Sequence, residues 1–189
     1  MSSGVSVLRQ DAKTQRRQAL VALAPLVEYP TDRSLALALV CRAEIGDRHP
    51  EAAAAVGRFL AWLANEPREA QEEVYTRTFL VMPSCVPYAS VHLFGDESFQ
   101  RGRLMAALRE AYDREGFDAG PELPDHVAVL LRFAPRLAPD ELEELVRYCL
   151  LEPVAKMAGQ LERTQNPYLH ALEAVRLVLE AWGEMEDPS

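Results

Sequence analysis

Apolar residues recur along this chain every three or four positions, which is the spacing of amphipathic helices, over most of its length. The first stripe consists of Leu20, Leu23, Ala24 and Val27. Pro30 predicts the end of this helix, because the residue before a proline is disfavoured in helical geometry. A second helix is expected to run to Gly46, a residue type common at helix C-termini, and Thr31 or Asp32 is positioned to cap its start.

Seven further stripes predict seven more helices. In chain order they are Val56, Phe59, Leu60 and Leu63; Val74, Tyr75, Thr78 and Phe79; Leu104, Met105, Leu108 and Tyr112; Val127, Leu130, Leu131 and Ala134; Leu142, Leu145, Val146 and Cys149; Val154, Met157, Ala158 and Leu161; and Leu172, Val175, Leu179 and Trp182. Ser98, Pro139 and Asn166 are residue types favoured at helix starts, and Gly116 is favoured at a helix end.

Eight or nine helices joined by short links predict an all-α fold, a single-domain helical bundle over residues 1–189. Its ends, residues 1–10 and 184–189, are expected to be flexible. Two segments rich in proline and glycine interrupt the helical pattern, Met82 to Gly95 and Asp118 to Pro124. The first is long for a link within a compact bundle, which indicates a functional loop.

The charge balance narrows the range of partners. Twenty-nine acidic and twenty basic residues give a formal net charge of −9. Phosphate binding requires a positive surface, so nucleic acid is not an expected partner. A basic peptide, for example one that carries arginines, remains compatible with an acidic protein.

Three cysteines, Cys41, Cys85 and Cys149, are far apart and odd in number, which predicts reduced and mostly buried thiols. No two form a CxxC pair, and no histidine lies three or four residues from a cysteine or from another histidine. A metal site is therefore not expected. The glycines are isolated, so no phosphate-binding loop and no bound cofactor are expected either.

No segment offers about 18 uninterrupted apolar residues, so the sequence predicts no membrane insertion. Arg16-Arg17 precedes an apolar stretch, as in a twin-arginine export signal. That stretch, Ala19 to Val27, is short, contains Pro25 and lacks a small-residue cleavage site. The sequence therefore predicts a cytoplasmic protein, with these arginines in the first turns of a helix.

Two groups of residues raise the question of catalysis. Ser90, His92 and Asp96 are close in the sequence, but the members of a catalytic triad are normally assembled from distant segments. Asp125 and His126 are adjacent at a helix start and point in different directions, which argues against a direct acid–base pair. We therefore predict that the protein is not an enzyme.

Four motifs occur in order and together form the most specific pattern in the sequence. They are Glu72-x-x-Tyr75-x-x-x-Phe79; Pro83-x-x-x-Pro87-Tyr88-x-Ser90; Gly95-Asp96 followed by Arg101-Gly102-x-x-Met105-x-x-Leu108; and Leu123-Pro124-Asp125-His126 before Leu130, Leu131 and Phe133. With these motifs the sequence resembles the DMSO-reductase maturation chaperones, which assist molybdenum-cofactor enzymes and include the nitrate reductase delta-subunit branch. The resemblance extends from about Leu20 to Trp182 and includes Leu26-x-x-Tyr29-Pro30.

The resemblance implies a non-catalytic assembly chaperone that binds the N-terminal segment of the catalytic subunit of a molybdopterin oxidoreductase. It would keep this client receptive to a molybdopterin guanine dinucleotide cofactor before assembly or export. Because the Gly95-Asp96 and Arg101 motifs are similar to the nitrate reductase branch, the first expected client is a respiratory nitrate reductase. The proline-rich loop is instead similar to the trimethylamine-oxide and DMSO reductase branch. A client of that type, or a permanent helical subunit of an oxidoreductase complex, remains the alternative, and a monomer or weak homodimer is expected.

The same motifs supply the candidate client-binding residues. These are Glu72, Tyr75, Phe79, Pro83, Pro87, Tyr88, Ser90, Asp96, Arg101, Met105, Pro124, Asp125 and His126. We expect the proline-rich loop to converge with Pro124-Asp125-His126 into a peptide groove.

Three alternatives stay open at this stage. Tyr75 and Phe79 belong either to the groove or to the core. The acids at 72, 96 and 125 either face the client or are solvated residues at helix starts. The loop from Met82 to Gly95 is either mobile until the client binds or pinned to the bundle by its own apolar residues.

Overall fold

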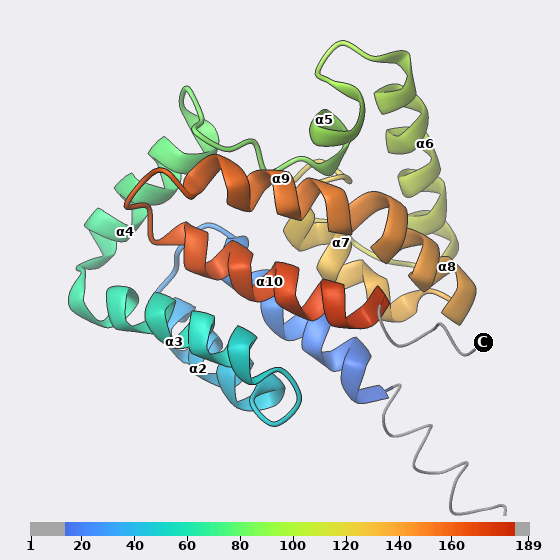
Figure 1. The fold of residues 1–189 in the computed structure, drawn as a ribbon. Helices are drawn as coiled ribbons and strands as arrows, with labels where there is room; N and C mark the ends of the chain where they lie inside the picture. The colour runs from blue at the N-terminus through green and yellow to red at the C-terminus, as the bar shows by residue number, and fades with distance from the viewer. Residues whose placement is uncertain (1–13, 184–189) are drawn as a thin grey trace, which may run out of the picture.

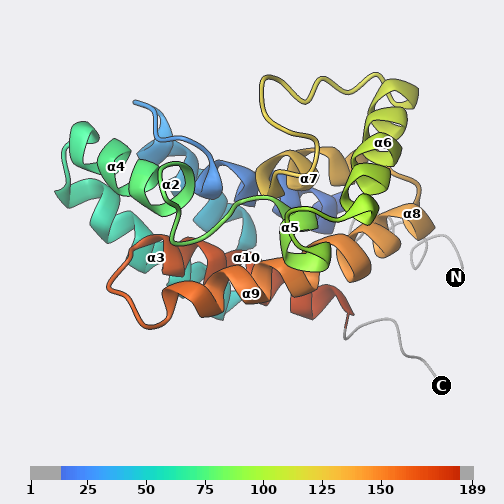
Figure 2. The same cartoon turned by 90° about the horizontal axis from the view of Figure 1, so that it is seen from above.

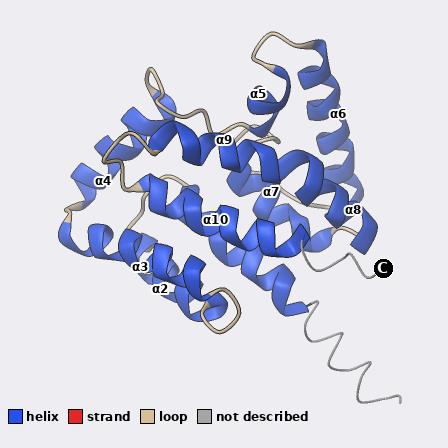
Figure 3. Cartoon of the chain, in the orientation of Figure 1, coloured by secondary structure: helices blue, strands red, loops and turns tan. Residues whose placement is uncertain are grey.

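A computed structural model describes residues 14–183, and helices make up its architecture (Figure 1). Within this range there is no β-strand, and Figure 3 shows helices joined by loops throughout. The prediction of an all-α domain is confirmed. The ends expected to be flexible, residues 1–10 and 184–189, lie outside the described residues. Among residues 14–183, none of the helices combines the length and apolar character that crossing a bilayer requires.

The N-terminal half begins with a helix over residues 14–23, which tightens into a 3-10 turn, η1 (Ala24–Val27). There follow α2 (Ser34–Ile45), α3 (Pro50–Asn65), α4 (Arg68–Tyr75) and a π-helical turn, η2 (Thr76–Leu80). The backbone becomes extended at Glu28, so the first helical segment ends just before Pro30, as predicted.

The C-terminal half contains the remaining elements. They are α5 (Ala89–Phe94), α6 (Phe99–Arg114), α7 (Val127–Phe133), the 3-10 turn η3 (Ala134–Arg136), α8 (Pro139–Glu144), the π-helical turn η4 (Leu145–Leu150), α9 (Leu151–Leu161) and α10 (Tyr168–Gly183). All the helices expected from the apolar stripes are present. The expected cap of α2 by Thr31 or Asp32 is wrong, because Arg33 precedes the helix and no side chain caps it. The Thr31 hydroxyl instead accepts from the backbone N–H of Arg33 at 3.2 Å, in the turn before the helix.

Side chains at two other helix starts act as the sequence predicts. The Ser98 hydroxyl accepts a hydrogen bond from the backbone N–H of Gln100 at 3.2 Å, at the start of α6. The Asn166 side-chain carbonyl accepts from the backbone N–H of Tyr168 at 3.0 Å, at the start of α10. Both bonds satisfy an N–H that has no partner inside its helix. Gly116, with φ 57°, follows α6 in the left-handed region that glycine adopts without strain.

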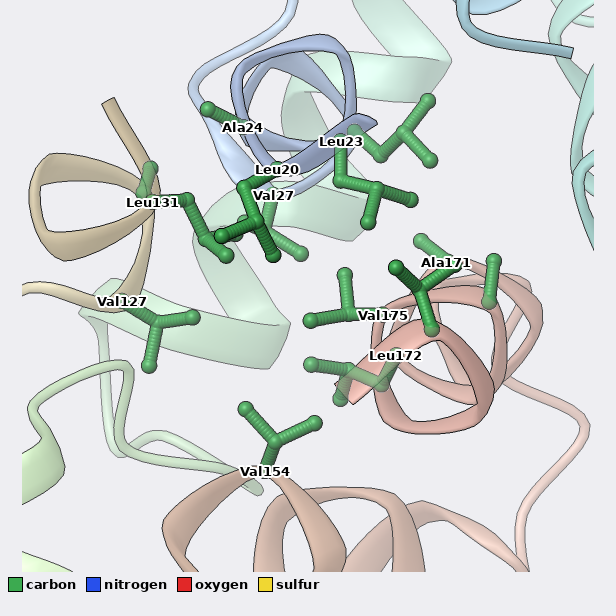
Figure 4. Close-up of a cluster of buried hydrophobic side chains, with 14 of the residues drawn as sticks. Leu20, Leu23, Ala24, Val27, Val127, Leu131, Val154, Ala171, Leu172 and Val175 are labelled. Atoms are coloured by element: carbon green, nitrogen blue, oxygen red, sulfur yellow. The ribbon is translucent and has the colours of Figure 1, made fainter. Parts of the chain in front are cut away.

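The core lies where four helical segments meet (Figure 4). The first helix contributes Leu20, α7 contributes Leu131, α9 contributes Val154 and α10 contributes Leu172, all fully buried. Burial of each such side chain contributes roughly 1.5–3 kcal/mol, so this contact region is a principal source of stability. Because residues so far apart in the chain meet there, the core sets the relative positions of the segments that carry the motifs.

Helix α10 packs against α3 and α9, and α2 packs mainly against α3 and η1. In Figures 1 and 2, α2, α3 and α4 lie at one end of the molecule and α6 and α8 at the other. Helix α5 packs on α9 and α6. The loop that precedes α5 therefore runs between the two ends.

The prediction of one loop from Met82 to Gly95 is wrong for its second half, because Ala89–Phe94 form α5. A helix of six residues is too short to show apolar periodicity, and such a segment does not form on its own. Ala89 and Ser90 are fully buried, and α5 packs on α9. Tertiary packing therefore creates this helix.

The two helices predicted from the stripes at 142–149 and 154–161 are parts of one helical stretch from Pro139 to Leu161. Pro153 lies near the start of α9 and has no N–H to donate to the preceding turn. The π-helical turn η4 directly precedes α9, and this wider turn lets the helix continue despite the proline.

Candidate functional site

Two of the sequence motifs meet at a backbone junction. The N–H of Val127 donates to the carbonyl of Pro87 at 3.0 Å, and the N–H of Ala89 donates to the carbonyl of Asp125 at 2.9 Å. Between these bonds, Tyr88 and His126 form an isolated antiparallel bridge, and their rings contact edge-on at 5.7 Å. The structure therefore brings the proline-rich loop and the Pro124-Asp125-His126 motif together.

A buried polar network extends from this junction. The Ser90 hydroxyl donates to Oδ2 of Asp125, and both residues are fully buried. Arg101 Nε donates to the Ser90 hydroxyl at 3.0 Å, and Arg101 Nη1 forms an ion pair with Asp96 at 3.2 Å. Four candidate residues thus form one network that ties α5 to α6 and to the start of α7.

This network corrects one expectation for the carboxylates. Asp125 is inside the protein and bonded to Ser90, so it cannot face a partner as a surface acid. Its second oxygen, Oδ1, has no hydrogen-bond partner among the described residues. Asp96 is exposed and Glu72 is partly buried in an ion pair with Arg68 at 2.7 Å. Of the three acids, only Asp96 has a largely solvent-exposed side chain.

His126 caps α7 instead of pairing with its neighbour. Its Nδ1 accepts a hydrogen bond from the backbone N–H of Ala128 at 3.1 Å, which leaves the ring proton on Nε2. Burial, together with the positive charge of Arg132, lowers the pKa of His126 to about 4. The ring is therefore neutral near pH 7, and its Nε2–H has no hydrogen-bond acceptor among residues 14–183.

Tyr75 and Phe79 belong to the core. Their rings are 5.0 Å apart, each contacts the buried ring of Tyr168, and both side chains are almost fully buried. Tyr75 also contacts Tyr29 edge-on at 5.2 Å. Burial keeps the Phe79 side chain from contacting a peptide directly. The Tyr75 side chain, by contrast, forms part of the lining of a cleft.

This cleft has a volume of about 270 Å³, which is below the roughly 300–1,000 Å³ typical of small-molecule pockets. Its lining residues are Glu28, Tyr29, Tyr75, Ala119, Gly120, Pro121, Glu122, His126, Ala128, Val129 and Arg132. They come from the segment after η1, the end of α4, the loop before α7 and α7 itself. A cleft of this size suits one side chain of a larger partner.

The cleft combines neutral donors with acidic residues. Arg132 forms an ion pair with Glu28 at 3.0 Å, whereas Glu122 is exposed and has no ion-pair partner among the described residues. Burial raises the pKa of Tyr75, and burial followed by the charge of Glu122 raises the pKa of Tyr88. Both phenols therefore stay protonated, and one uncompensated carboxylate remains at the cleft.

The other candidates do not line this cleft. Pro83 is exposed in the loop after η2, Pro87 is buried at the junction, and Met105 is partly buried on α6. Pro124 is buried, and its carbonyl accepts a hydrogen bond from the Tyr112 hydroxyl at 2.6 Å. Pro87 and Pro124 therefore hold the junction in place, whereas Pro83 and Met105 are not part of it.

Of the eleven cleft residues, only Tyr75 and His126 were among the candidates. Four of the other nine carry a charge or an aromatic ring: Glu28, Tyr29, Glu122 and Arg132. Leu26-x-x-Tyr29-Pro30 was part of the sequence resemblance, and this segment was the available signal for Tyr29 and its neighbour Glu28. Glu122 and Arg132 had no comparable signal in the sequence. Acidic and basic residues are common on the surface of any helical protein, so their presence does not mark a binding site.

The structure describes neither a metal-binding cluster nor a Ser90–His92 pair at this site. Among residues 14–183, no group of three or more His, Cys, Asp or Glu side chains is placed to hold a metal ion. Ser90 and His92 do not bond to each other, because His92 Nε2 contacts the carbonyl of Val86 at 2.7 Å. The three cysteines are unpaired, with Cys41 and Cys85 buried. What the arrangement offers is an aromatic cleft with hydrogen-bond donors and one free carboxylate.

Comparison with known proteins adds three findings. The model of the family described as "nitrate reductase delta subunit" matches residues 47–174. That range includes all four sequence motifs and both sides of the backbone junction. A search of curated proteins finds no significant match.

Among solved structures, the chain is similar to a candidate redox enzyme maturation protein from Archaeoglobus fulgidus, with a TM-score of 0.64 and 24% sequence identity. The likeness covers 87% of this chain and 93% of that one. At this identity the match shows a shared fold.

Proposed function

This chain belongs to the nitrate reductase delta subunit family, and we propose that it is a non-catalytic, cytoplasmic assembly chaperone for a molybdenum-cofactor oxidoreductase. It binds the N-terminal segment of the catalytic subunit and supports insertion of the cofactor into that client before assembly or export. A respiratory nitrate reductase is the client that the family favours.

The observation that carries this proposal is the junction of Tyr88 with His126, beside the cleft. The junction joins two of the motifs through which the sequence resembles maturation chaperones, and His126 also lines the cleft. A cleft for a single side chain suits recognition of an extended or helical peptide, which binds by placing a few anchor side chains. The role of the cleft is thus to receive one anchor of the client segment.

Recognition follows from the groups that the cleft presents. The rings of Tyr29 and Tyr75 provide aromatic walls, and Nε2–H of His126 provides a donor. Glu122 supplies a negative charge that favours a cationic side chain. The net charge of −9 also attracts a basic segment at longer range, which raises the association rate.

The test is a calorimetric titration of the full chain with a synthetic peptide of the N-terminal segment of the host's nitrate reductase catalytic subunit. The Tyr88→Ala variant should bind roughly tenfold or more weakly, because it removes the ring that contacts His126, a lining residue of the cleft. Tyr148→Ala is the matched control, because Tyr148 is 64% exposed on η4 and neither lines the cleft nor pairs with His126. Circular dichroism verifies that both variants keep their helices.

Two results would redirect the proposal. If the peptide of a DMSO- or trimethylamine-oxide-type reductase binds more tightly than the nitrate reductase peptide, the chain serves that client. If the chain stays with the purified active enzyme, it is a permanent subunit. Equal affinities for wild type and Tyr88→Ala would contradict the placement of the site.

A further inference from the structure

Two hydrogen-bond donors face the Tyr75–His126 cleft without an acceptor. The side chains of Tyr75 and His126 are each only 2% exposed, and both line the cleft. Because His126 Nδ1 accepts from the N–H of Ala128, the neutral ring can only donate through Nε2–H. Neither this group nor the Tyr75 hydroxyl has an acceptor within residues 14–183. In that same range, neither atom belongs to the fully buried unpaired ones, so each donor reaches the accessible space of the cleft.

These donors determine what a ligand in the cleft must carry. A donor on a buried side chain is costly when its acceptor is removed. Water can satisfy such a donor, but a ligand that displaces water must reproduce its hydrogen bonds. Lysine and arginine side chains have no acceptor, so a cationic group inside the cleft would leave Nε2–H of His126 unpaired. The group that enters the cleft must therefore contain an acceptor.

The local charge requires this acceptor to be neutral. After burial, the charge of Glu122 is the largest cause that raises the pKa of Tyr75, and the charge of Glu28 adds to it. The carboxylates that oppose ionisation of the Tyr75 phenol also oppose a carboxylate or a phosphate of a ligand beside it. Arg132 is already paired with Glu28 at 3.0 Å, which weakens its attraction for a further anion.

We propose that the cleft binds the primary amide of a glutamine or asparagine side chain in the client segment. This inference rests on the proposed function and names the chemistry of the anchor at the same site. The amide is neutral, and its carbonyl oxygen has two lone pairs that accept from the Tyr75 hydroxyl and from Nε2–H of His126. Its NH2 group donates to Glu122, whose exposed carboxylate still has lone pairs for a neighbouring cationic residue of the client.

Two other neutral acceptors fit the cleft less well. A hydroxyl accepts and donates through one oxygen, whereas the cleft has its two donors on buried side chains and its free carboxylate on an exposed one. An amide places the acceptor and the donor on separate atoms. A main-chain carbonyl of the client is the second alternative, but a cleft of about 270 Å³ suits one inserted side chain. The side-chain amide therefore matches both the polarity and the size of the cleft.

The test is a calorimetric titration of the full chain with the reductase peptide, nitrate or DMSO type, that it binds more tightly. Each glutamine of the peptide is replaced singly by methionine and each asparagine by leucine, which removes the amide at similar volume. One replacement should weaken binding roughly tenfold or more, because two donors on buried side chains lose their acceptor. Tyr75→Phe removes only the hydroxyl and should weaken binding of the unaltered peptide roughly fivefold.

A double-mutant cycle connects the changes in the peptide and in the protein. The decisive peptide replacement should cost less in Tyr75→Phe than in the wild type, because one of the two bonds is already absent. The same holds for His126→Asn, which keeps a cap for α7 but is too short to place a donor at the position of Nε2. Tyr148→Phe is the control, since Tyr148 is exposed on η4 and does not line the cleft, and it should change nothing.

Several results would overturn the amide proposal while the chaperone role stands. One is tight binding of a peptide that contains neither glutamine nor asparagine, and another is a Tyr75→Phe variant that binds as tightly as the wild type. If Tyr75→Phe weakens every peptide of the set by the same factor, the acceptor is a main-chain carbonyl instead of a side-chain amide. If the wild-type chain binds none of the reductase peptides, the proposed function fails and this inference fails with it.

Discussion

The rings of Tyr88 and His126 meet edge-on with their centroids 5.7 Å apart, and the backbones of the same two residues pair. One contact therefore joins the end of the proline-rich loop to the start of α7. His126 caps that helix through Nδ1 and lines the cleft with the rest of its ring. A change at this residue thus affects both the stability of the fold and the shape of the binding site.

The burial of His126 makes the stability of the protein depend on pH. The pKa of His126 in the folded state, about 4, lies below the ordinary histidine value of 6.5, so the unfolded state takes up the proton first as the pH falls. The contribution of His126 to the free energy of unfolding is therefore fully present above pH 6.5 and is lost as the pH falls from 6.5 to about 4. Near pH 5 the loss in the free energy of unfolding should be on the order of 2 kcal/mol, measured by urea denaturation.

The variant His126→Asn separates this effect from other titrations. Asparagine is a good N-cap residue and does not titrate, so the variant keeps a cap for α7. Its free energy of unfolding should change less between neutral pH and pH 5 than that of the wild type. Identical pH profiles for the two proteins would show that His126 is not the responsible group.

The Ser90–Asp125 bond should matter more than the ion pair beside it. Ser90→Ala leaves the buried Asp125 carboxylate and Arg101 Nε without a principal partner, which should cost roughly 1–3 kcal/mol in urea denaturation. Asp96→Ala removes only an ion pair whose acid is 79% exposed, so its cost should be below about 1 kcal/mol. Equal losses would mean that the buried network does not hold α5 in place.

Client binding should depend on salt. If Glu122 attracts a cationic side chain, the affinity for the client peptide should fall with added salt, because exposed charges are screened within about 8 Å at physiological ionic strength. Glu122→Gln should flatten this dependence, whereas Glu162→Gln, an exposed acid outside the cleft, should not. Affinity that is independent of salt in the wild type would indicate a wholly apolar contact.

The loop before the junction should exchange its amide hydrogens quickly in the free protein. Met82 is 91% exposed and has φ 46°, an uncommon conformation for a residue with a side chain. Ser90, by contrast, is fully buried and its N–H donates to Asp125 at 3.3 Å. We expect fast exchange at Met82 and Ser84, slow exchange at Ser90, and protection of the first two when the client peptide binds. Fast exchange that the client does not change would make this segment a connector only.

The sequence by itself determined the helices and their ends. The spacing of Val154, Met157 and Leu161 predicts one buried side of a helix, because side chains three or four positions apart share a face. Ser98 and Asn166 act on N–H groups two positions away, so their effect needs no information from elsewhere in the chain. Such signals are local and can be recognised from residue order alone.

Only the tertiary structure decided which side chains reach the surface. The spacing of Tyr75 and Phe79 predicts a common side, but that side is buried because Tyr168 of α10 packs against it. In the same way, Arg132 of α7 meets Glu28 after η1, and this pair forms one wall of the cleft. Contacts of this kind depend on how distant helices pack around the shared core. The local spacing of residues within one segment does not determine that packing, so these contacts could not be predicted from the sequence pattern.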